Sequence, residues 1–248
     1  MVAKQPQDNQ LIKTTSSLSI ASVLFALLVV ILLFSVSQFS LTVLPIRQIL
    51  LEGKFQYSDP HQLQHVLDQS AKSGLFALDL REIKTELLQF PWIKSVEIER
   101  IWPDRLRVYI TEKNPYLRLG DDKIVSVDGT AFSPGSTQKF SDLPLFDLHN
   151  RQFTPELFKA YREIEYLLAQ NGYELRQFHI NEQGIWSLDL ANDIRITIGR
   201  HNPLTVFKRF VVIWPNIGYE RINTLKSVDL RYENGFALEY TEHGNQRK

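Results

Sequence analysis

The chain has 248 residues, and its 28 basic and 28 acidic side chains give a formal net charge of zero. This balance supports neither a nucleic-acid-binding protein, which needs a basic surface, nor an acidic disordered chain. The absence of cysteine excludes disulfides, thiolate nucleophiles and cysteine-bound metals.

One uncharged, strongly apolar run lies near the start of the chain, from Leu18 to Leu44. A helix that crosses a bilayer needs about 20 apolar residues, each rising about 1.5 Å. We therefore predict a single transmembrane helix over residues 18–44, preceded by a tail at residues 1–17. The alternative is a cleaved signal peptide, because Ser35 and Ser37 resemble the small residues of a cleavage site.

The charges that flank this run are few on both sides, so the positive-inside rule does not fix its orientation. A short tail followed by a large folded region favours a cytoplasmic tail with the bulk of the chain outside. In a bacterium this is a single-pass type II protein of the inner membrane, with its folded part in the periplasm.

The next segment alternates strand and helix signals in the order strand, helix, helix, strand, strand. A short strand that contains Ile46, Ile49 and Leu51 is expected to end at Gly53. The two helices begin at Ser58 and Asp79, which are predicted N-caps. Alternating apolar residues predict two strands on either side of a turn at residues 102–104. This order indicates a small α+β module with both helices on one face of its sheet.

Three segments of this module carry a family resemblance: Pro91–Val96, Glu99–Leu106 and Glu112–Pro115. They resemble a POTRA domain, and more narrowly the POTRA domain of the FtsQ/DivIB family of bacterial division proteins. The resemblance implies a POTRA domain at residues 45–114, immediately outside the membrane.

The second half of the chain has a different, strand-rich pattern. It resembles the β-rich second domain of the same family, which implies a domain at residues 115–243 and a tail at 244–248. The expected helices begin at Thr154 and Asn202, and the expected strands include Phe178–Ile180, Trp186–Leu190 and Ile194–Ile198. The fold class is therefore α+β, with an antiparallel sheet and packed helices in the second domain.

The last two strands form a hairpin whose register can be tested by its apolar pattern. A two-residue turn at Asn234-Gly235 would place the apolar side chains of the two strands on opposite faces. A three-residue loop instead puts six of them on one face, with Gly235 at positive φ in a bulged type I turn. We predict this second register, which pairs Tyr232 with Phe236, Leu230 with Leu238 and Val228 with Tyr240.

A final strand needs its outer edge covered or paired. The resemblance implies that the division protein FtsB adds a strand at this edge, where β-augmentation supplies main-chain hydrogen bonds. Alternatively, Tyr232 and Tyr240 face the core and Arg231 lies on a solvated face. The predicted partner-binding residues are Arg231, Tyr232, Glu233, Asn234, Gly235, Phe236 and Tyr240.

Patterns that carry catalysis or bind metals are weak in this chain. Ser136 and Lys139 match S-x-x-K but lie in a loop without the partner motifs of penicillin-binding enzymes. His61 and His65 share a helix face without a third ligand. We predict no catalytic residue, cofactor or metal, and we expect Trp92 and Trp102 to be packing residues.

The resemblance implies a non-enzymatic scaffold that binds FtsB-like and FtsL-like proteins and links early and late division proteins at the septum. Neither nucleic acid nor a small-molecule substrate is expected. One alternative is a POTRA-containing periplasmic chaperone or secretion component. Another is an envelope enzyme, although the sequence has no recognisable nucleophile.

Overall fold

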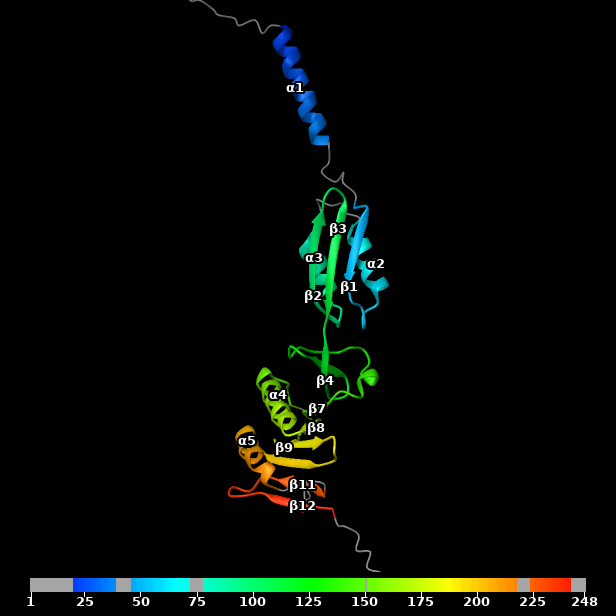
Figure 1. The fold of residues 1–248 in the computed structure, drawn as a ribbon. Coiled ribbons are helices and arrows are strands. Elements are labelled where there is room, and N and C mark those ends of the chain that lie inside the picture. The colour runs from blue at the N-terminus through cyan, green and yellow to red at the C-terminus, as the bar shows by residue number, and fades with distance from the viewer. Residues whose placement is uncertain (1–19, 39–45, 72–77, 150, 218–223, 242–248) are drawn as a thin grey trace, which may run out of the picture.

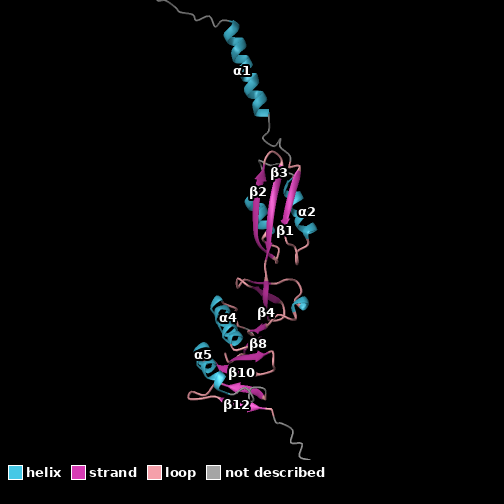
Figure 2. Ribbon diagram, viewed as in Figure 1, coloured by secondary structure: helices cyan, strands magenta, loops and turns pink. Residues whose placement is uncertain are grey.

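A computed structural model describes residues 20–38, 46–71, 78–149, 151–217 and 224–241. Along the chain they form the helix α1, a three-stranded α/β unit and a nine-stranded sheet with two long helices (Figures 1 and 2). This mixed arrangement confirms the predicted α+β class. The predicted tails, residues 1–17 and 244–248, lie outside the described residues.

The helix α1 (Ile20–Gln38) contains no charged residue. Within the described part of the chain, no helix has the length and apolarity needed to cross a membrane. The predicted span of residues 18–44 extends beyond α1 at both ends, into residues outside the described part.

The first folded unit has the predicted order of strand, helix, helix, strand and strand. Its sheet order is β1-β3-β2, with β1 parallel to β3 and β2 antiparallel to β3. Leu106, Val108 and Ile110 alternate along β3 and are buried beneath the helices. The elements are β1 (Gln48–Gly53), α2 (Pro60–Ser70), α3 (Leu80–Leu87), β2 (Ile93–Ile101) and β3 (Arg105–Glu112).

The helix starts of this unit confirm one predicted N-cap and correct the other. The Asp79 carboxylate accepts the backbone N–H groups of Arg81 and Glu82, as predicted for the start of α3. The N-cap of α2 is Asp59 rather than Ser58. The prediction was wrong because the Asp59 carboxylate accepts the His61 N–H at 2.9 Å, whereas the Ser58 hydroxyl is buried away from the helix start. The N–H of Ser58 donates to the Glu112 carboxylate at 2.7 Å, a contact across 54 residues.

The second folded unit is a single nine-stranded sheet in the order β12-β11-β10-β9-β8-β7-β4-β5-β6. Its strands are β4 (Pro115–Leu119), β5 (Lys123–Ser126), β6 (Ala131–Phe132), β7 (Leu145–Asp147), β8 (Leu175–Ile180), β9 (Trp186–Leu190), β10 (Arg195–Gly199), β11 (Leu225–Asp229) and β12 (Ala237–Tyr240). The strands β8 to β10 confirm the strands expected between residues 178 and 198. The sheet is mixed and not antiparallel as predicted, because β7 runs parallel to β4 and β8, and β10 runs parallel to β11. The connections from β7 to β8 and from β10 to β11 each contain a helix, which returns the chain to the same end of the sheet.

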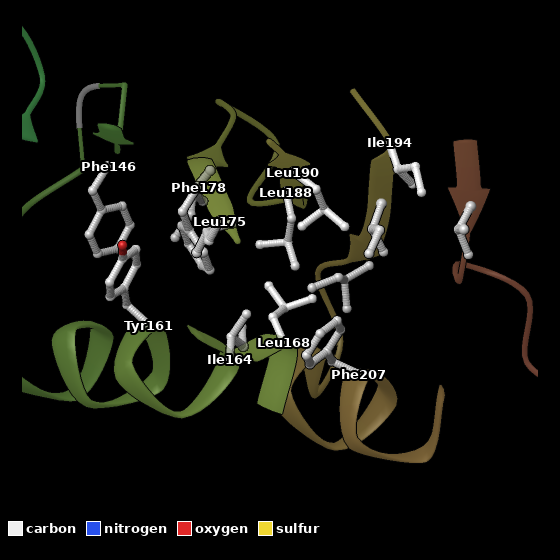
Figure 3. Packing of buried hydrophobic residues seen from close by; sticks show 14 of the residues in the cluster. Phe146, Tyr161, Ile164, Leu168, Leu175, Phe178, Leu188, Leu190, Ile194 and Phe207 are labelled. Carbon is white, nitrogen blue, oxygen red and sulfur yellow. The ribbon is translucent and has the colours of Figure 1, made fainter. Parts of the chain in front are cut away.

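Two helices, α4 (Pro155–Gln170) and α5 (Pro203–Ile213), cover one face of this sheet. Each starts as predicted with a proline in its first turn, and the Thr154 hydroxyl accepts the Leu157 N–H. Figure 3 shows Ile164, Leu168 and Phe207 directed from the helices toward the strands. They meet the buried side chains of Phe178 and Leu188, which closes the main core.

The C-terminal hairpin differs from its predicted register. β11 and β12 pair Asp229 with Ala237 and Val228 with Leu238, so their loop spans residues 230–236. The reason is that the Leu230 N–H donates to the Thr197 carbonyl at 2.8 Å, which carries the chain along β10 instead of β12. Gly235 does not adopt a positive φ, and Tyr232 is exposed rather than on the shared apolar face.

An aromatic cluster joins the two folded units. Trp92 stacks on Tyr57 with 4.2 Å between ring centroids, and it lies 4.9 Å from Phe132 and 5.3 Å from Phe140. Trp92 is therefore a packing residue, as predicted. Trp102 differs from the prediction, because 59% of its surface is exposed.

Candidate partner-binding site

The strand β12 ends the nine-stranded sheet, and among the described residues no strand lies beyond it. A terminal strand presents backbone N–H and C=O groups that a further strand can pair with. β12 is only four residues long and follows the wide loop of residues 230–236. The candidate site therefore consists of a short open strand and the loop that precedes it.

The structure brings the predicted partner-binding residues together in this loop and strand. Residues 231–235 are all exposed, and 60% of the surface of Tyr232 is accessible. Phe236 is half-buried and contacts Phe210 edge-on, with 5.4 Å between ring centroids. Tyr240 is half-buried at the far end of β12, opposite Leu225. The segment thus combines five consecutive exposed residues with half-buried side chains at Phe236 and Tyr240 that anchor it.

Arg231 is held within the site by its own neighbour Asp229. Its guanidinium donates two hydrogen bonds to the Asp229 carboxylate, with Nε–Oδ1 at 2.9 Å and Nη2–Oδ2 at 2.6 Å. These hydrogen bonds lower the pKa of Asp229. An acidic partner residue would therefore meet an arginine that is already fixed in orientation, which limits the entropy lost on contact.

A second charged group lies on the solvent face of β11 and β12. The Glu239 carboxylate accepts hydrogen bonds from Lys226 at 2.8 Å and from Ser227 at 2.9 Å. These two donors lower the pKa of Glu239. A charged side chain in an edge strand discourages indiscriminate strand pairing, so the edge favours a partner that complements its charges.

A hollow of about 700 Å³ borders the exposed loop. It is lined by the apolar side chains of Ile185, Val206 and Leu230, by Arg200 and Arg209, and by residues 231–233. Apolar side chains beside a few charged ones suit the side chains of a peptide ligand. The hollow can therefore receive apolar and acidic side chains of a segment that contacts residues 231–233.

Sequence reasoning missed this hollow because its walls come from four separate segments. One local signal was available in the sequence, because Gly199 and Asn202 are of the two residue types that most readily adopt positive φ. Both do so here, at the end of β10 and directly before α5. That turn brings Arg200 and His201 to the hollow. Neither residue was among the predicted partner-binding residues.

The patterns considered for catalysis or metal binding do not assemble into such a site. Within the residues that the structure describes, no group of three or more histidine or acidic side chains could hold a metal ion. Ser136 precedes the short 3-10 helix η3 (Gln138–Phe140), whereas Lys139 lies within it. His61 and His65 are exposed on α2.

Comparisons with known proteins identify the type of both folded units. Residues 44–113 match the POTRA domain of FtsQ type, and residues 116–231 match the C-terminal domain of the cell division protein FtsQ/DivIB. The chain is thus a POTRA-domain protein whose second domain matches a domain of bacterial cell division proteins.

Whole-chain similarity identifies the family. The chain is 31% identical over 194 residues to the cell division protein FtsQ of Methylomonas methanica, covering 78% of each chain. It is 30% identical to FtsQ of Xanthomonas campestris, over 79% of this chain and 69% of that one. It is also 30% identical to FtsQ of Allochromatium vinosum, over 80% and 79%. The chain belongs to the FtsQ family of cell division proteins.

Proposed function

We propose that this protein is a non-enzymatic scaffold of the divisome that binds FtsB-like and FtsL-like proteins and links early and late division proteins at the septum. The observation that carries the proposal is the open edge of β12, together with the exposed loop before it. A scaffold needs such a surface and needs no reactive group.

The partner contact is strand addition along β12. Its backbone groups supply affinity, and the side chains of residues 231–236 and Tyr240 supply selectivity. An exposed tyrosine beside an arginine-lined hollow has the composition of an interface hot spot. The partner segment is therefore an extended strand that carries acidic and apolar side chains.

The anchor of the scaffold is the uncharged stretch of residues 18–44. Support comes from α1, where large apolar side chains such as Leu24, Phe25 and Phe34 have more than half of their surface exposed. Leaving so much apolar surface in water is unfavourable, and a bilayer removes it from water. The bulk of the chain then lies in the periplasm, in a single-pass type II arrangement.

The test uses the full chain in lipid nanodiscs with the periplasmic segments of FtsB-like and FtsL-like partners. Tyr232→Ala is expected to weaken binding by about 2 kcal/mol, or roughly 30-fold. Gly235→Glu adds charge and bulk at the edge, where a Cβ meets open space and the fold is kept. Both variants should unfold at the wild-type temperature.

The matched control is Tyr166→Ala, because Tyr166 is also 60% exposed but lies on α4, away from the edge. It should bind the partners as the wild type does. Undiminished binding by folded Tyr232→Ala and Gly235→Glu variants would remove β12 as the binding edge. The anchor is tested separately, since a membrane-spanning chain stays with the vesicles in alkaline carbonate.

A further inference from the structure

The turn between β2 and β3 exposes a large aromatic side chain at one end of the POTRA domain. The turn consists of Trp102, Pro103 and Asp104. Trp102 has 59% of its surface exposed, whereas Trp92 and Trp214 are buried. An exposed tryptophan at the tip of a hairpin adds little to the core, so its position needs another explanation.

This turn lies where the chain enters the domain. β1 and β3 run parallel from the same end, with Gln48 opposite Arg105. The Arg47 N–H donates to the Asp104 carbonyl at 2.8 Å, and the Arg47 Nε lies 3.4 Å from the Asp104 carboxylate. Figure 1 shows the arch from β2 to β3 at the end of the domain that receives the chain from α1.

The distance from this turn to the proposed anchor is short. Arg47 is the first charged residue after the uncharged stretch that ends at Leu44. Three residues span at most about 10 Å when fully extended. The headgroup layer on each side of a bilayer is roughly 5–8 Å thick. An anchor that ends near Leu44 therefore holds Arg47, and the turn bonded to it, at the level of the headgroups.

The residues of the turn are of types that occur in the headgroup layer of a membrane. Tryptophan is enriched at membrane–water interfaces because its ring is apolar while its N–H can reach water and headgroups. Arg47, Arg100 and Arg105 are exposed at the same end, against the carboxylates of Asp104 and Glu99. The excess of positive charge attracts anionic headgroups over about one Debye length.

We propose that the tip of the β2–β3 hairpin is a second membrane contact, in which Trp102 enters the headgroup layer of an anionic bilayer. The contact rests on the proposed membrane anchor. In addition, it fixes the orientation of the POTRA domain relative to the membrane. A single attachment leaves the POTRA domain free to turn, whereas two attachments fix which side faces the membrane. The edge of β12 is then held at the far end of the molecule, directed away from the membrane.

The chain allows a direct test by tryptophan fluorescence. None of its four tryptophans lies in the uncharged stretch, and Trp186 and Trp214 belong to the distal sheet domain. The full chain is reconstituted into vesicles of phosphatidylcholine and phosphatidylglycerol that carry bromine near the headgroup end of the acyl chains. The wild type is expected to lose the emission of one tryptophan, and Trp102→Phe should lose none.

Two further variants complete the experiment. Trp186→Phe is the matched control, and it should show the same loss of emission as the wild type. Arg105→Glu is expected to reduce the quenching in vesicles that contain phosphatidylglycerol, and to change it less in pure phosphatidylcholine, because it removes the attraction to anionic headgroups. Trp102→Phe and Arg105→Glu should keep the wild-type circular dichroism and unfolding temperature. Trp186→Phe, whose ring packs on Phe178, needs only to remain folded at the temperature of the measurement.

The outcomes separate this inference from the proposed anchor. If the protein resists carbonate extraction but the wild type and Trp102→Phe are quenched equally, the hairpin contact is overturned and the anchor stands. If the protein is extracted by carbonate, both are overturned. If quenching is absent while Trp102→Phe loses binding to a division protein, the tip is a protein contact and the membrane contact is wrong.

Discussion

The two edge strands of the nine-stranded sheet, β6 and β12, differ in whether other side chains cover them. At one end, Phe132 of β6 is covered by Trp92, and Trp92 in turn stacks on Tyr57. At the other end, β12 has no strand beyond it within the described residues, and Tyr232 beside it is exposed. Both ends carry aromatic side chains. Their neighbours, rather than their residue types, decide which end is structural and which is available to a partner.

The covered end is also where the two domains are joined. The Lys113 N–H donates to the Trp92 carbonyl at 2.7 Å, and the Val127 N–H donates to the Asn114 carbonyl at 3.0 Å. The ammonium of Lys113 lies 4.5 Å from the ring centroid of Phe132, and its burial lowers its pKa. This junction holds the POTRA domain and the sheet together, while the open end lies on the opposite side of the sheet domain (Figure 1).

The largest effect is expected when the covered end is broken with Trp92→Ala. The change removes a buried side chain that contacts three aromatic rings, so it should lower the free energy of unfolding by about 3–5 kcal/mol. Denaturant unfolding of the full chain in detergent measures the loss. Partner binding at β12 should persist under conditions in which the variant is still folded.

The matched control for this change is Trp102→Ala. The side chain of Trp102 is mostly exposed, so its loss should cost less than about 1 kcal/mol. Equal destabilisation by the two substitutions would show that burial in the aromatic cluster is not what distinguishes Trp92.

Phe236→Ala tests which residues near the open edge of β12 stabilise the fold. Phe236 contacts Phe210 and is half-buried, so its truncation should cost about 1–2 kcal/mol. Tyr232→Ala, four residues earlier, should leave stability unchanged. Denaturant unfolding gives the free energies, and faster hydrogen exchange at residues 230–240 locates the change. If both substitutions left stability and exchange unchanged, Phe236 would not anchor the loop.

Helix starts and central strands were predictable because their determinants are local. The caps at Asp79 and Thr154 and the strand at Trp186–Leu190 each depend on residues within one short segment. The N-cap of α2 lies one residue later than predicted, because Asp59 accepts the His61 N–H while the Ser58 hydroxyl is buried. Ser58 is held in this position by Glu112, distant in sequence, which accepts its N–H. A distant contact of this kind leaves no trace in the local pattern.

The predicted register of the C-terminal hairpin was also wrong because it ignored contacts with segments distant in sequence. Counting apolar residues on one face treated Tyr232 as core, although it is exposed. The parallel pairing of β10 with β11 then draws Leu230 toward Thr197 and widens the loop. The predicted partner-binding residues came from the family resemblance. The hollow beside them needed the positions of segments 183–185, 198–202 and 206–209 as well.

A smaller effect is expected from Arg209, one of the charged residues that line the hollow beside residues 231–233. Arg209→Ala removes one positive charge from a largely solvated position, so it should weaken partner binding by about 1 kcal/mol or less. The loss should appear mainly as slower association, and it should shrink as the salt concentration rises. Surface plasmon resonance at two salt concentrations measures both. A faster dissociation without salt dependence would place Arg209 in a buried contact instead.

The smallest effect concerns the charge contact across the domain junction, where Lys94 lies 3.2 Å from Asp128. The Ser126 hydroxyl and the Thr130 N–H also donate to the Asp128 carboxylate, and these hydrogen bonds hold its pKa well below the ordinary value. A carboxylate with a lowered pKa in the folded state stabilises the fold above its unfolded pKa, near 3.8, and this contribution is lost as the pH falls below that value.

Asp128→Asn should therefore reduce stability by less than about 1 kcal/mol at pH 7, since the pair is partly exposed. At pH 3 the wild type and the variant should differ less, because Asp128 is then largely protonated in the unfolded chain and must release that proton on folding, which lowers the stability of the wild type. Denaturant unfolding at both pH values checks this, with the exposed Asp122→Asn as control. A constant difference between wild type and Asp128→Asn would mean that packing, not charge, joins Lys94 and Asp128. The junction would then depend on its aromatic cluster alone.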